Sequence, residues 1–106
     1  MKSIEQLESE AQRSMAKGGF QNCISSLNQA LEIAQSSKPS DLVLVARLLN
    51  NLGFSYRQLM DLQKAEEYFK QSLKLERQIG DPDNPEMAIT LQHLGRLAHF
   101  RQEYDT

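Results

Sequence analysis

Apolar residues recur at helical spacings of three and four along almost the whole chain, and they fall into five blocks. Within each block the apolar positions share one helix face, while charged and amide side chains occupy the other. Alternation with period two never persists, so no block predicts a strand. The pattern predicts an all-α fold of five helices, with apolar blocks from Ile4 to Met15, Phe20 to Ala34, Leu42 to Leu59, Leu62 to Ile79 and Ile89 to Phe100.

Four short breaks separate the blocks: Gly18–Gly19, "SSKPSD" at 36–41, Met60–Asp61 and "GDPDNP" at 80–85. In the second break, Ser40 or Asp41 can cap the following helix by accepting an orphan backbone N–H. In the last break, Gly80 suits a left-handed helix terminus, and the prolines prevent the helix from continuing. The fifth helix is therefore expected from about Glu86 to Gln102.

The chain repeats itself with a period of 42 residues. This spacing relates Leu7, Leu49 and Leu91, then Ala11, Gly53 and Gly95, and also the pairs Cys23 and Ala65, Leu27 and Phe69, and Leu31 and Leu73. A fixed period between about 20 and 50 residues is typical of a solenoid, in which neighbouring units complete each other's core. The sequence therefore predicts one domain, residues 1–106, with units at about 1–40 and 41–82 and a partial unit at 83–106.

The middle unit carries a motif with a family resemblance. It reads Leu49-x-x-Leu52-Gly53-x-x-Tyr56, followed by Ala65-x-x-x-Phe69, and the third unit begins similarly with Leu91, Leu94, Gly95 and Ala98. This pattern closely resembles the tetratricopeptide repeat signature. The resemblance implies a right-handed α-solenoid of antiparallel helix pairs, with about two and a half repeats in five helices.

Two features depart from the usual repeat of this family. The period is 42 residues instead of about 34, and Arg77 stands where a helix-ending proline is typical. Both helices of a unit should therefore be longer, as in the repeats of kinesin light chains, which this variant resembles. Because the third unit stops after its first helix, we expect a fragment of a longer repeat array. The alternative is a small protein with a lone capping helix.

Gly53 lies inside an otherwise strong helix pattern, where glycine costs about 1 kcal/mol relative to alanine. Two antiparallel helices approach closely only where one or both lack large side chains. We therefore expect Gly53 and Ala65 to lie at a contact between helices, with Tyr56 and Phe69 filling the space beside them. Cys23, which aligns with Ala65, is expected to be a small, buried packing residue.

Charge and composition exclude several classes of function. The chain has 12 basic and 14 acidic residues and a net charge of −2, which is too little positive charge for general nucleic-acid binding. The longest apolar run, "LVLVA" at 42–46, is far too short to cross a membrane. A single cysteine fits the reducing cytoplasm. Catalytic, metal-binding and phosphate-binding motifs do not occur, so we expect neither an enzyme nor a cofactor.

The resemblance implies that the first helix of each unit lines a concave surface. Asparagine amides on this surface can bind a peptide backbone, arginine forks can hold its carboxylates, and Phe54 can pack on an apolar side chain. We therefore expect a groove that binds a peptide segment of a protein partner with acidic residues. The candidate contacts are Arg47, Asn50, Asn51, Phe54, Arg57, Gln92 and Arg96.

Two other interpretations stay open. A row of charged and amide side chains such as these candidate contacts is also typical of a solvated helix face that binds nothing. In addition, the last helix has no covering helix in the sequence, which leaves Leu94, Leu97 and Phe100 short of apolar contacts. The alternative function is therefore self-association, with a homodimer forming through the C-terminal helix.

Overall fold

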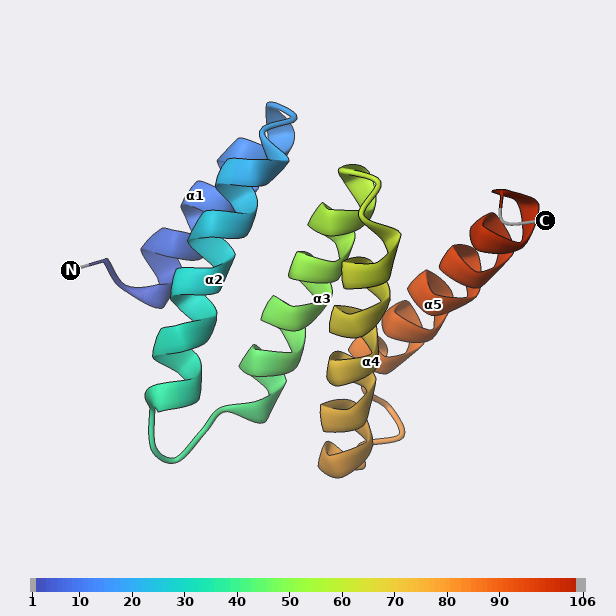
Figure 1. Ribbon diagram of the computed structural model, residues 1–106. Helices are drawn as coiled ribbons and strands as arrows, with labels where there is room; N and C mark the ends of the chain where they lie inside the picture. The colour runs from blue at the N-terminus through green and yellow to red at the C-terminus, as the bar shows by residue number, and fades with distance from the viewer. Residues whose placement is uncertain (1, 105–106) are drawn as a thin grey trace.

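The computed structural model describes residues 2–104, and the side chains of residues 2–100. Its helices form two antiparallel hairpins followed by a single last helix, arranged side by side in chain order (Figure 1). This part of the chain contains no strand, and none of its helices combines the length and the apolar character of a membrane span. The helices are α1 (Ile4–Ala16), α2 (Phe20–Ser36), α3 (Leu42–Gln58), α4 (Leu62–Ile79) and α5 (Pro85–Tyr104). The predicted all-α fold of five helices is confirmed.

Polar side chains directly before three of the helices determine where these helices begin. Ser3 Oγ accepts the backbone N–H of Gln6 at 3.2 Å, and the Gln6 side chain accepts the backbone N–H of Ser3 at 2.8 Å. Asp41 caps α3 and Asp61 caps α4, each through a carboxylate oxygen. At the other end of α4, Gly80 has a φ of 67°, the left-handed geometry that the sequence predicts.

The core runs through the first hairpin into α3. Leu7, Leu27 and Leu52 are at most 1% exposed and belong to one cluster, which joins α1, α2 and α3. Cys23 is fully buried in this cluster, and its Sγ lies 3.3 Å from Oγ of Ser55. The prediction that Cys23 is a buried packing residue is confirmed.

The two helices of the second hairpin approach closely where their side chains are small. Ala65 of α4 is fully buried, and the ring of Phe69 lies directly against Gly53 of α3. Tyr56 is half-buried nearby and stacks on Tyr68, with 5.4 Å between ring centroids. The helix contact predicted at Gly53 and Ala65 is therefore confirmed.

The buried stripe of α4 differs from the predicted one in its second half. The apolar pattern continues the stripe from Phe69 to Leu73, but Leu73 is only half-buried. The interior positions after Phe69 are instead Ser72 and Glu76, which are at most 1% exposed. Helical spacing allows either continuation, and the packing of α3 and α5 against α4 selects the polar one.

The last helix is partly covered, but not where the sequence suggested. Leu97 is 1% exposed and packs with Ala65 and Phe69, so the expectation that Leu97 lacks a covering helix is wrong. The large apolar side chains that α5 leaves exposed include Ile89, at 41%, and Leu91, at 47%, whereas Leu49, one period before Leu91, is 2% exposed. α5 therefore buries one face on α4 and α3 and leaves another face exposed in the part of the chain described.

Candidate functional site

The predicted contact residues come from α3 and α5, and side-chain bonds tie these helices together and to α1. Glu8 of α1 binds Arg47 of α3, and Asn50 of α3 binds Thr90 of α5. The first helix of each unit is therefore the neighbour of the next first helix. We call the surface that these three helices form the α1–α3–α5 face.

Arg47 already holds a carboxylate at one end of this face. Its Nε donates to Oε2 of Glu8 at 3.1 Å and one terminal nitrogen donates to Oε1 at 3.0 Å, which makes a forked, bidentate pair. The pair lines a shallow hollow of about 410 Å³ together with Glu5, Ser9 and Gln12. The side chain of Arg47 is 44% exposed, so solvent and a competing carboxylate can both reach it.

Asn50 does not lie on a free helix face. It is 4% exposed, and its Nδ2 donates to Oγ1 of Thr90 at 2.7 Å and to Oε2 of Glu86 at 3.3 Å. Both partners belong to α5, which covers this position. The expectation that Asn50 faces away from the core is therefore wrong, because its amide joins α3 to α5.

A buried polar network continues from Asn50 into α4. Oγ1 of Thr90 and Oγ of Ser72 both lie 2.6 Å from Oε1 of Glu76, and Ser72 also reaches the backbone carbonyl of Ala46 at 3.0 Å. Oε2 of Glu76 is buried and has no partner among the described residues. Hydrogen bonds between buried groups stabilise the fold, because a buried polar atom without a partner lowers the free energy of unfolding. The network therefore holds α3, α4 and α5 in one fixed arrangement.

The helical pattern of the sequence does not predict this network, although the sequence carries one signal of it. Ser72 lies three residues after Phe69, and Glu76 lies four residues after Ser72, so both lie on the same stripe as Phe69 and Ala65. Polar residues on a stripe that is otherwise buried indicate an interior hydrogen-bond network. The part of Thr90 in this network could not be predicted from the sequence, because its partners Asn50 and Glu76 come from two other helices.

An aromatic cluster with two arginines nearby lies between α3, α4 and α5. The ring of Phe54 contacts His93 edge-on at a centroid distance of 6.1 Å, and His93 stacks on Phe69 at 4.7 Å. Burial, and then the positive charges of Arg57 and Arg96, hold the pKa of His93 below its ordinary value of 6.5, although the charge of Glu86 acts in the opposite direction. The ring of Phe54 therefore contacts His93, and Arg57 and Arg96 lie close enough for their charges to act on it.

A family model of the tetratricopeptide repeat matches residues 44–106, which is more than half of the chain. The chain belongs to the tetratricopeptide repeat family. Proteins of this family generally mediate protein–protein interactions, and their helical repeats are typically non-catalytic scaffolds.

Among solved structures, this repeat chain is similar to the crystal structure of BtubC (BKLC) from P. vanneervenii. The TM-score is 0.82 and the sequence identity is 22%, over 96% of this chain and 40% of the other. The chain thus spans less than half the length of that protein, and the similarity shows a shared fold. A search of curated proteins gives no match.

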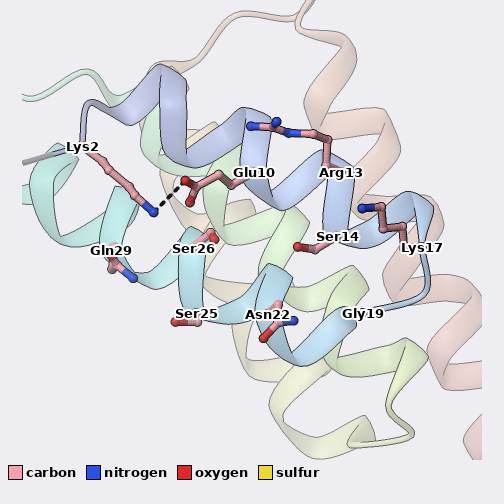
Figure 2. Close-up of a pocket in the computed structure, with 10 residues that line it drawn as sticks. All are labelled: Lys2, Glu10, Arg13, Ser14, Lys17, Gly19, Asn22, Ser25, Ser26 and Gln29. Carbon is pink, nitrogen blue, oxygen red and sulfur yellow. Dashed lines mark ion pairs between the residues drawn. The ribbon is translucent and has the colours of Figure 1, made fainter.

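The outer surface of the first hairpin is polar. A hollow of about 640 Å³ lies there between α1 and α2, and its ten lining residues carry no large apolar side chain (Figure 2). Across it, Nζ of Lys2 lies 2.6 Å from Oε1 of Glu10. The hollow offers no apolar anchor for a partner.

The remaining predicted contact residues, Asn51 and Gln92, lie on different helices, α3 and α5. Asn51 is half-buried, with its backbone carbonyl accepting a hydrogen bond from Ser55 at 2.9 Å, and Gln92 is exposed. Of the seven candidates, Phe54, Arg57 and Arg96 form one group, and Arg47 is paired separately with Glu8. Groups of three or more metal-binding side chains do not occur within residues 2–100.

Proposed function

We propose that this chain is a non-catalytic, cytoplasmic protein-interaction module that binds a peptide segment of a partner on the α1–α3–α5 face. The observation that carries the proposal is the group formed by Phe54, Arg57 and Arg96 around His93. Phe54 is half-buried, so it offers ring surface to a ligand while its position is fixed by neighbouring rings. Two arginines beside such a ring favour a peptide that has an apolar residue close to carboxylates.

Charge along the face adds a direction to this proposal. Glu5 and Glu8 lie at the α1 end, whereas Arg57 and Arg96 lie toward α5. An asymmetric peptide would therefore bind with its acidic residues toward α5, because like charges repel it at the other end. Arg47 contributes only after its bond to Glu8 opens, and Asn50 contributes nothing directly because it is buried.

Selection from a random peptide library on the purified chain tests the proposal. We expect selected peptides to combine an aromatic or aliphatic residue with Asp or Glu, and to lose binding to the double variant Arg57→Glu with Arg96→Glu. The matched control is Arg13→Glu with Arg77→Glu, which changes the net charge equally at two exposed positions away from the group. Peptides that bind both double variants equally well would contradict the proposal.

A second candidate function is self-association through α5. Leu91 is 47% exposed, and a Cβ built on Gly95 would meet nothing within 4 Å, so this helix face is open. Two such faces can pack on each other about a twofold axis. We expect light scattering to show a dimer whose mass falls to that of the monomer in Leu91→Glu, and a wild-type monomer at high concentration would remove this candidate.

A further inference from the structure

A groove on a different part of the molecule has the features of a second peptide site. Its lining residues come from the end of α2, the first half of α3 and the second half of α4. The connection between α2 and α3 lies at the same end of these helices (Figure 1). The volume of the groove is about 380 Å³, within the range of about 300–1,000 Å³ that is usual for ligand pockets. We call it the α2–α3–α4 groove, and it shares no lining residue with the proposed site around Phe54.

The floor of the groove is apolar and rigid. Val45 and Leu49 are 5% and 2% exposed and belong to the core, so they cannot move aside, while Leu75 is half-buried beside them. Leu42, at the start of α3, is 37% exposed and extends this apolar surface into solvent. A large aliphatic or aromatic side chain entering the groove would cover Leu42 and remove apolar surface from water.

The rim of the groove is polar, and its only charge is positive. Gln35, Gln71 and Gln78 line it, and none of their amides forms a hydrogen bond within residues 2–100, so each can bond to the backbone of a peptide. Lys74 is the one charged lining residue, and it makes no ion pair in the same part of the chain. An unpaired ammonium group beside an apolar floor favours a carboxylate next to an apolar side chain.

We propose that the α2–α3–α4 groove binds an extended segment of a partner protein in which a large apolar residue is followed closely by a carboxylate. The apolar side chain packs on Val45 and Leu42, and the carboxylate pairs with Lys74. The glutamine amides bond to the peptide backbone. This site is independent of the α1–α3–α5 face, so the chain can hold two segments at once.

Two small probes separate the contributions of the apolar floor and of the charge. N-acetyl-L-leucine carries the side chain and a carboxylate, whereas N-acetyl-L-leucinamide carries the same side chain without charge. In a titration of the isotope-labelled chain followed by NMR, we expect saturable shifts in the amides of residues 42–49 and 71–78 with both probes. The acid should bind about two- to fivefold more tightly than the amide, as expected for an exposed ion pair.

Four single variants complete the experiment. Lys74→Gln should abolish the preference for the acid, while Lys70→Gln, on the same helix but outside the groove, should keep it. Leu42→Ser should weaken both probes, whereas Val43→Ser, which alters a more exposed neighbour outside the groove, should weaken neither. Shifts confined to other surfaces, equal binding of the two probes to the wild type, or equal effects of the two serine variants would overturn the proposal.

Discussion

The ring of Phe69 occupies the space that a side chain on Gly53 would need. A Cβ built on Gly53 would lie 2.7 Å from Cε1 of Phe69 and 2.9 Å from its Cζ, closer than carbon atoms approach each other. Phe69 is fully buried and stacks on His93, so its ring has little freedom to move. Glycine at position 53 is therefore required by helix packing, which outweighs its unfavourable helix propensity.

We expect Gly53→Ala to lower the free energy of unfolding by about 1–2 kcal/mol, because overpacking costs more than the gain in helix propensity. Gly95→Ala is the matched control, one period later, where a Cβ meets nothing within 4 Å. That variant should be more stable by up to about 1 kcal/mol. Urea unfolding followed by circular dichroism measures both changes, and changes of the same sign would contradict the packing argument.

The buried network makes a second prediction at Thr90. Thr90→Val keeps the shape of the side chain but removes the hydroxyl that Asn50 and Glu76 both contact. Since a buried polar group then loses its partner, we expect a loss of about 1–3 kcal/mol in unfolding free energy. Thr90→Ser keeps the hydroxyl and should cost less than the valine variant in urea unfolding. A valine variant as stable as wild type would show that the network contributes nothing.

His93 predicts a pH dependence of stability. Its pKa in the folded chain is below the ordinary value of 6.5, chiefly through burial, with Arg57 and Arg96 adding to the effect and Glu86 opposing it. The unfolded chain therefore binds the proton more readily, and stability from this group is complete above pH 6.5 and decreases as the pH falls below it. Thermal melts at a series of pH values should show that decrease, and His93→Gln should reduce its slope. An unchanged slope in the variant would contradict this assignment.

The pair of Arg47 and Glu8 predicts a small coupling. Both side chains are partly exposed, so a double-mutant cycle with Arg47→Ala and Glu8→Ala should give a coupling energy of about 0.2–1 kcal/mol. Screening by salt should weaken it further at about 1 M ionic strength, where the Debye length is about 3 Å. A coupling that does not respond to salt in urea unfolding would indicate a contribution other than charge.

The candidate site was only partly predictable from the sequence. The stripe of Arg47, Asn50, Phe54 and Arg57 follows from helical spacing alone, and the helix is where it was expected. The spacing of residues along α3 does not predict which of these side chains the next repeat unit covers. α5 packs over Asn50, which is 4% exposed, and leaves Arg47 accessible. His93, at the centre of the aromatic cluster, is not among the predicted contacts, because its ring partners lie on two other helices, α3 and α4.

The sequence by itself determined the helices, their breaks and the contact between α3 and α4 at Gly53 and Ala65. These depend on local properties: the spacing of apolar residues, the turn residues at 36–41 and 80–85, and the small volume of Gly53 and Ala65. Only the tertiary structure decided the polar contacts. Arg47 lies 39 residues from its partner Glu8 along the chain, and Asn50 lies 40 residues from Thr90. No local sequence pattern specifies such distant partners. Helix packing brings them together, because side chains from different units share one interior and one surface.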